Sequence, residues 1–228
     1  MSKIRVVIAD DHPIFSRGLC QVVMGDPAFE LVAEAQDGET ALQHIQKERP
    51  DVAVLDIDMP KKDGFDVVRA MEERKLSSAV VFLTMHKDEE LFNGAMDLGV
   101  RGYVLKESAF SELIDSIKAV AAGRHFVSPA LSTYLLNRRK RNEALVEDRP
   151  GLKELTVTEG RVLQLIAAGK STTEIARELC LSIRTIENHR AHICNRLNLQ
   201  GRDALLRFAL THKSELLLSG RPNPSSSM

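Results

Sequence analysis

Short β-branched runs alternate with helical patterns through the first 122 residues, and this alternation limits the fold more than any other property of the sequence. The runs are IRVVIA (4–9), FELVAEA (29–35), VAVLD (52–56), AVVFLT (79–84) and GYVL (102–105). Between them apolar residues recur at helical spacing, as with Ile14, Leu19 and Val23. Such an alternation predicts an α/β domain: a doubly wound, five-stranded parallel sheet at residues 1–122.

The charges divide the chain into two parts. Residues 1–122 carry 14 Lys and Arg against 22 Asp and Glu, a net charge of −8, and residues 123–228 carry 17 against 10, a net charge of +7. This asymmetry indicates two domains with different partners. The absence of a signal-peptide pattern or a membrane-length apolar run predicts a cytoplasmic protein. There Cys20, Cys180 and Cys194 are expected to be reduced, packing thiols.

Residues 123–150 are predicted to be a linker, and residues 151–216 a small all-α domain. In the linker Ser128 and Pro129 begin a short helix, after which RRKRNEALVEDRPG is a charged, solvated stretch. In the all-α domain, capping boxes begin helices at 156–159 and 171–174, Ser182 caps a third helix, and DALLRFAL predicts a fourth. Residues 217–228 are expected to be disordered.

Polar residues stand at the carboxyl ends of four of the predicted strands. Asp10 and Asp11 follow the first, Asp56 ends the third, Thr84 ends the fourth and Lys106 follows the fifth. These ends share one edge of a parallel sheet, so the five residues are expected to line one cleft. Three carboxylates repel one another unless a divalent cation lies between them, and Mg²⁺ favours oxygen ligands. The cluster therefore predicts phosphoryl transfer to Asp56, with Lys106 and Thr84 contacting the phosphoryl oxygens.

This set of residues resembles the receiver domain of bacterial two-component response regulators, which implies a flavodoxin-like fold for residues 1–122. The matching positions are Asp10-Asp11, Asp56, Met59-Pro60, Gly64, Thr84 and Lys106. The resemblance implies that Asp56 accepts phosphate from a histidine kinase. It also implies that Asp10, Asp11 and Asp56 hold Mg²⁺ together with the backbone carbonyl of Asp58.

The same resemblance implies that Tyr103 is the switch aromatic, which turns inward when Thr84 moves toward the phosphoryl group. It places the Asp58 and His86 side chains where the family adjusts the lifetime of the phosphate. Simpler alternatives remain for these residues: the acids at 10 and 11 end a strand and cap a helix, Thr84 and Tyr103 only pack, and Asp58 and His86 are solvated.

A tight turn before the third helix of the second domain, residues 182–197, predicts a helix-turn-helix. Its buried stripe is predicted to be Ile186, His189, Ile193 and Leu197, so His189 is expected in the core. A metal site of His189, His192 and Cys194 is not expected, because these residues do not share one helix face. The opposite face carries side chains that can pair with bases in a major groove, or lie solvated. The predicted DNA-contacting residues are Lys170, Arg184, Thr185, Glu187, Asn188, Ala191, His192 and Asn195.

Residues 151–216 resemble the LuxR-type helix-turn-helix of the NarL/FixJ response regulators. The matching positions are Leu155-Thr156, Glu159, Leu163, Gly169, Glu174-Ile175-Ala176, Leu179, Thr185 and His189. Two positions depart from the family pattern: Thr158 stands where Arg is usual, and Glu187 where many members carry Lys. The second departure prevents base preference from being inferred by analogy.

Taken together, these patterns predict a DNA-binding response regulator rather than an enzyme, with chemistry limited to its own phosphorylation and dephosphorylation. Its expected partners are a histidine kinase, promoter DNA and, when phosphorylated, a second copy of the chain, but not a membrane. One alternative is a Mg²⁺-dependent aspartyl-phosphate phosphatase, because Asp56-Ile57-Asp58 resembles the acid pair of haloacid-dehalogenase enzymes. Another is a DNA-binding protein whose first domain only docks and is never phosphorylated.

Overall fold

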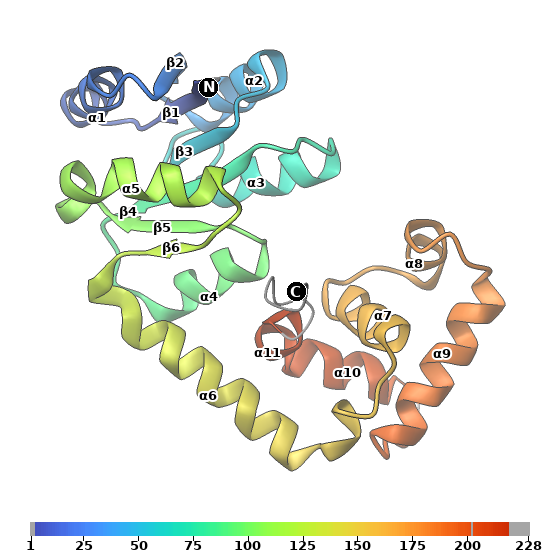
Figure 1. The fold of residues 1–228 in the computed structure, drawn as a ribbon. Helices are drawn as coiled ribbons and strands as arrows, with labels where there is room; N and C mark the ends of the chain where they lie inside the picture. Colours follow the sequence, from blue (N-terminus) through green and yellow to red (C-terminus); the bar gives the residue numbers. More distant parts are fainter. Residues whose placement is uncertain (1–2, 202, 219–228) are drawn as a thin grey trace, which may run out of the picture. The chain divides into compact units, whose positions relative to one another are not determined.

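The first domain is built on a parallel sheet with the strand order β2-β1-β3-β4-β5-β6 (Figure 1). The computed structural model describes residues 3–201 and 203–218. All five predicted strands are confirmed: β1 (Ile4–Ala9), β2 (Phe29–Ala35), β3 (Val52–Asp56), β4 (Ala79–Thr84) and β5 (Gly102–Leu105). The order reverses between β1 and β3, which is where a doubly wound sheet opens a crevice for ligands.

Helices cover both faces of this sheet. They are α1 (Pro13–Gly25), α2 (Gly38–Glu48), α3 (Gly64–Glu73), α4 (Glu89–Asp97) and α5 (Ala109–Ala121). Alternate strand residues separate two cores, one under α1 and α5 and the other under α2, α3 and α4. Leu19 and Val23 are fully buried as predicted, but Ile14 is 91% exposed and that prediction was wrong. Ile14 lies nine residues before Val23, about 180° around the helix at about 100° per residue.

A sixth strand, β6 (Phe126–Val127), corrects the prediction of a five-stranded sheet. It pairs in parallel with β5 through Gly102↔Phe126 and Tyr103↔Val127. Two residues are too few to give a strand pattern in the sequence. Ser128, predicted to cap a helix, makes no cap hydrogen bond; its buried hydroxyl instead accepts from the Leu105 backbone N–H at 3.0 Å.

The predicted solvated linker is largely helical, which is a second correction. After a 3₁₀ turn at Pro129–Leu131, α6 extends over Ser132–Asp148 and ends before a 3₁₀ turn at Pro150–Leu152. Arg139 and Glu143, four residues apart, form an ion pair at 2.8 Å, and most residues of this segment favour helix. Leu145 is 7% exposed and belongs to the core of the second domain. Residues up to Tyr134 and from Leu135 onward form separate compact units.

The second unit is all-helical, as predicted. It contains α7 (Val157–Ala167), α8 (Thr172–Glu178), α9 (Ile183–Arg196), α10 (Ala204–Thr211) and α11 (Lys213–Leu218). Both capping boxes are present, and Ser182 accepts from the Thr185 backbone N–H. The predicted disordered tail lies outside the described residues except for positions 217 and 218, which end α11.

The cysteines are all free, but they are not all packing thiols. Cys20 is buried and Cys194 half-buried, whereas Cys180 is exposed, so the packing prediction was wrong for Cys180. Among the described residues, no helix has both the length and the apolar character needed to cross a membrane.

Glu159 ties the start of α7 to the end of α9. Its Oε2 accepts from the Thr156 backbone N–H at 2.9 Å and lies 2.6 Å from an Arg196 nitrogen, and the side chain is 3% exposed. Burial on its own would raise the pKa of Glu159, but the Thr156 hydrogen bonds and the Arg196 charge outweigh it and lower the pKa.

We expect Glu159→Ala to destabilise the second domain by about 2 kcal/mol at pH 7, because it removes a cap and leaves Arg196 unpaired. Since the folded-state pKa is lowered, this contribution is present above the unfolded pKa and disappears as the pH falls through the folded value. Urea unfolding followed by circular dichroism at pH 7 and at pH 3 measures both effects. Glu174→Ala, in the exposed capping box of α8, is the control with a smaller expected loss. Equal losses in the two variants would contradict this role for Glu159.

Candidate functional site

The predicted acidic residues meet at the carboxyl edge of the sheet, where the strand order reverses. Asp10 follows β1 and is fully buried, and Asp56 is the last residue of β3 and 1% exposed. Thr84 ends β4 and is fully buried, and Lys106, 7% exposed, follows β5. The structure therefore brings together residues that are up to 96 positions apart in the sequence (106 − 10).

Lys106 lies between two buried carboxylates. Its Nζ is 2.6 Å from Asp56 Oδ2 and 2.8 Å from Asp10 Oδ2. Burial raises the pKa of Asp56 to about 6, although the hydrogen bond and charge of Lys106 oppose this rise. Burial would lower the pKa of Lys106, but the adjacent Asp10 and Asp56 carboxylates outweigh it and raise the pKa. At neutral pH this is an ion-paired cluster with an ionised Asp56.

The cluster has more acidic than basic charge and fits a hard divalent cation. Asp10, Asp11, His12 and Asp56 each offer one ligand atom, and these atoms lie within 4.8 Å of one another. Asp10 Oδ2 and Asp11 Oδ1 lie close to Lys106 and His12, yet neither accepts a hydrogen bond of good geometry from a described residue. Both buried oxygens therefore remain available to a cation.

His12 was not predicted as part of this cluster. Its Nδ1 lies 2.7 Å from Asp11 Oδ1, and its backbone N–H donates to Asp10 Oδ1 at 2.8 Å. The only signal in the sequence was its position directly after the acid pair.

Tyr103 already lies inside the domain. Its ring is fully buried and packs edge-on against Phe92, with ring centroids 5.2 Å apart. Its hydroxyl has no hydrogen-bond partner among the described residues; burial raises the pKa of Tyr103 to about 12, and the Thr84 hydroxyl opposes that rise. The inward turn that the sequence predicted on phosphorylation is therefore not needed to reach this position.

Asp58 and His86 form a pair at the rim of the cluster. His86 Nε2 lies 2.9 Å from Asp58 Oδ2, and both side chains are at least half exposed. The Asp58 backbone N–H donates to Asp56 Oδ1 at 3.2 Å, and the His86 backbone N–H donates to Thr84 Oγ1 at 2.9 Å. The loops after β3 and β4 are thus fixed to the residues that end these strands.

Gly64 permits the loop after β3 to fold back onto its strand. A Cβ at this position would lie 2.7 Å from the Asp56 carbonyl oxygen, closer than real Cβ atoms approach, and 3.1 Å from Ile57 Cα. The Gly64 N–H donates to the Ile57 carbonyl at 2.8 Å. A larger residue here would displace the backbone that carries Asp56.

The third helix of the second unit, α9, presents one polar face. Ile186 and Ile193 are fully buried and Leu197 is 2% exposed, as the predicted stripe required. His189 is only half-buried, and its Nδ1 is buried without a hydrogen-bond partner among the described residues. Six of the predicted DNA-contacting residues are exposed: Arg184, Glu187, Asn188, Ala191, His192 and Asn195.

The remaining predicted DNA contacts are placed differently. The Thr185 hydroxyl pairs with the Ser182 hydroxyl at 2.7 Å, within the helix cap. Lys170 is half-buried in the turn before α8. His192, although exposed, has its Nδ1 3.6 Å from Glu159 Oε1 and so lies toward α7. A metal site was not expected at His189, His192 and Cys194, and these three do not form a metal-binding cluster among the described residues.

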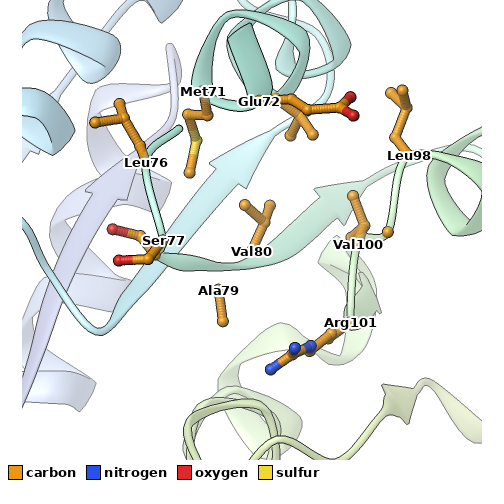
Figure 2. Close-up of a pocket in the computed structure, with 12 residues that line it drawn as sticks. Met71, Glu72, Leu76, Ser77, Ala79, Val80, Leu98, Val100 and Arg101 are labelled. Carbon is orange, nitrogen blue, oxygen red and sulfur yellow. The ribbon is translucent and has the colours of Figure 1, made fainter. Parts of the chain in front are cut away.

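A cavity of about 220 Å³ lies at the other edge of the sheet (Figure 2). Met71 of α3 and Val80 of β4 point toward one another in it, with Glu72 and Arg101 near its rim. It adjoins the start of β4, whereas Thr84 ends that strand, so this cavity is remote from the acidic cluster.

Comparison with known proteins agrees with both halves of this architecture. Residues 6–118 match the response regulator receiver domain, and residues 153–209 match the LuxR family of bacterial regulatory proteins. The transcriptional regulatory protein DegU of Brevibacillus brevis is 35% identical over 213 residues, covering 88% of this chain and 90% of DegU. The oxygen regulatory protein NreC of Staphylococcus epidermidis is 33% identical and covers 92% of this chain and 98% of NreC.

Solved structures of similar proteins include a receiver domain and a regulator bound to DNA. The receiver domain of NarL from Mycobacterium tuberculosis is 35% identical, with a TM-score of 0.53, and covers 54% of this chain and all of that one. RcsB from Salmonella enterica serovar Typhimurium, bound to a promoter in the presence of a phosphomimetic, is 27% identical with a TM-score of 0.56. That match covers 91% of this chain and 98% of RcsB.

A doubly wound domain with an acidic cluster at its switch point, followed by a helix-turn-helix unit, defines a phosphorylation-controlled transcription regulator. The chain belongs to the NarL/FixJ family of two-component response regulators, with a receiver domain followed by a LuxR-type DNA-binding domain. This family consists of transcription regulators, which counts against the aspartyl-phosphate phosphatase alternative.

Proposed function

We propose that Asp56 accepts a phosphoryl group from a histidine kinase, and that the phosphorylated chain binds promoter DNA as a homodimer in the cytoplasm. The observation that carries this proposal is the buried Asp56 carboxylate, paired with Lys106 at 2.6 Å and adjacent to Asp10. A buried nucleophile beside a cation is suited to forming an acyl phosphate. The complete set of acids, hydroxyl and ammonium counts against a first domain that only docks.

The transfer requires one bond to form and one to break. A carboxylate oxygen of Asp56 attacks the phosphorus of the kinase phosphohistidine, the P–N bond breaks, and the imidazole leaves. Lys106 places a positive charge beside the incoming phosphoryl oxygens, and the Thr84 hydroxyl donates to one of them. Asp10, Asp11, Asp56 and the Asp58 carbonyl would hold Mg²⁺, which would supply positive charge to neutralise the phosphoryl oxygens.

DNA binding is assigned to residues 151–216, with α9 in the major groove. Exposed Arg184 and Asn188 can pair bidentately with guanine and adenine, and Ala191 can contact a thymine methyl. RcsB, which matches 91% of this chain, is solved bound to promoter DNA. A single unit this small makes few phosphate contacts, so pairing two units on a two-fold site raises affinity through effective concentration.

The test combines labelling and DNA titration. The full chain is incubated with ³²P-acetyl phosphate in Mg²⁺ or in EDTA, and labelled and unlabelled chain are then titrated with promoter and scrambled duplexes. We expect labelling only with Mg²⁺, and tighter binding of the labelled chain to a specific site. Labelling that is unchanged in EDTA, or equal DNA affinity of the labelled and unlabelled chains, would overturn the proposal.

A further inference from the structure

The first turn of α6 is attached to the loop that follows Thr84. The Tyr134 hydroxyl donates to the backbone carbonyl of Lys87 at 2.8 Å. Lys87 lies between the end of β4 and the start of α4 at Glu89, three residues after Thr84. This contact joins a segment next to the acidic cluster to the helix that leads out of the receiver.

Aromatic rings provide a second connection between the same two places. The Tyr134 ring lies 5.8 Å from the ring of Phe92 in α4, and Phe92 is 5.2 Å from Tyr103 in β5. Phe92 and Tyr103 are fully buried, and Tyr134 packs at the edge of the same core. In such close-packed surroundings, a shift of Tyr103 displaces Phe92 and then Tyr134 rather than being absorbed by empty space.

The loop between β4 and α4 contacts residues on several other elements near the phosphorylation site. The Lys87 ammonium pairs with Glu107 at 2.8 Å, and His86 pairs with Asp58 at 2.9 Å. Asp88 caps α4 through the backbone N–H groups of Glu90 and Leu91. The His86 backbone N–H donates to Thr84 Oγ1 at 2.9 Å, so movement of Thr84 reaches this loop.

The other end of α6 is also buried. Leu145, eleven residues beyond Tyr134 in the same helix, is part of the core of the DNA-binding unit. The helix α6 therefore contributes residues to both units. Tyr134 is the last residue of the first compact unit, at the point where the chain passes from one to the other.

From these contacts we infer that Tyr134 is a positioning residue that couples the phosphorylation site to the linker helix. This role rests on the proposed phosphorylation of Asp56. The hydroxyl follows the loop after β4, and the ring follows Phe92 and Tyr103. The start of α6 therefore responds to phosphorylation of the receiver, and the gain in DNA affinity depends on Tyr134.

Tyr134→Phe tests the hydroxyl contact while keeping the ring. One ordinary hydrogen bond changes a two-state equilibrium by a factor of about 2 to 10. We expect the variant to be labelled at Asp56 like the parent, whereas the gain in DNA affinity on phosphorylation falls by about 2- to 10-fold. Leu136→Ala, on an exposed residue of the same helix, is the matched control and should keep the parent's gain.

Hydrogen exchange gives a readout that a purely structural role would not move. In the parent, phosphorylation should change the exchange of backbone amides at residues 132–137, and in Tyr134→Phe that change should be lost at an unchanged melting temperature. A variant with the parent's gain in affinity and the parent's exchange response would overturn the coupling. A parent that shows no phosphorylation response would instead remove the proposed function, and the coupling with it.

Discussion

The Asp56→Asn variant is expected to take up no phosphoryl group from acetyl phosphate, with labelling reduced by at least about 100-fold. An amide of the same shape fills the position but is not a nucleophile. Lys106 remains paired with Asp10 at 2.8 Å, so the neighbouring side chains stay in place. Phosphorylation-dependent DNA binding should be lost together with the label, and both are measured on the same preparation.

Asp58→Asn is the matched control, because Asp58 is only two residues away and its side chain is 62% exposed. It keeps its backbone carbonyl and should still be labelled. If Asp56→Asn were labelled at the parent's level, the phosphoryl group would have to be on another residue.

The Asp56→Asn variant is also expected to change the stability of the receiver. The folded-state pKa of Asp56, about 6, lies above the ordinary value of 3.8, so ionising this group destabilises the fold as the pH rises through 6. In EDTA we expect Asp56→Asn to be more stable than the parent by roughly 2 kcal/mol at pH 7.5, with the difference disappearing below about pH 4. A destabilised variant would show that lost labelling reflects misfolding.

Asn188→Ala is expected to lose discrimination between specific and scrambled duplexes by about 1–3 kcal/mol, the value of one bidentate base contact. Asn188 is exposed on α9, opposite buried Ile186 and Ile193, so its replacement leaves the core intact. Binding titrations of the phosphorylated full chain on both duplexes measure the effect.

Lys170→Ala provides the contrast. It lies outside α9, and if it contacts a phosphate it should weaken binding to both duplexes alike and reduce the salt dependence. An Asn188→Ala variant with unchanged site preference would remove α9 from the role of reading bases.

The sequence was sufficient for the parts of the structure that local patterns determine. The strand that ends at Asp56 and the strand that ends at Thr84 were predicted with their observed bounds, because β-branched runs stop there at polar residues. Parallel strands then placed the two side chains at one edge without further information. The capping boxes likewise gave the starts of α7 and α8.

Contacts between residues far apart in the chain could not be predicted from the sequence. Tyr134 donates to a backbone carbonyl 47 positions away. Every residue has such a carbonyl, so the residue type does not show which one accepts the hydrogen bond. The contact between His12 Nδ1 and Asp11 Oδ1 depends on side-chain rotamers. The length of α6 was missed because its charged residues resemble a solvated linker until Leu145 is seen to be buried.

The residues that hold α9 in its domain, such as Arg196 with Glu159, are different from the residues that face outward on α9. One Glu159 oxygen fixes the end of α9 through Arg196, while Arg184, Glu187 and Asn188 contribute nothing to the core. Substitutions at those outward positions are therefore nearly neutral for folding. After gene duplication, a copy of such a regulator can acquire new operators through a few surface changes while its anchoring residues stay the same.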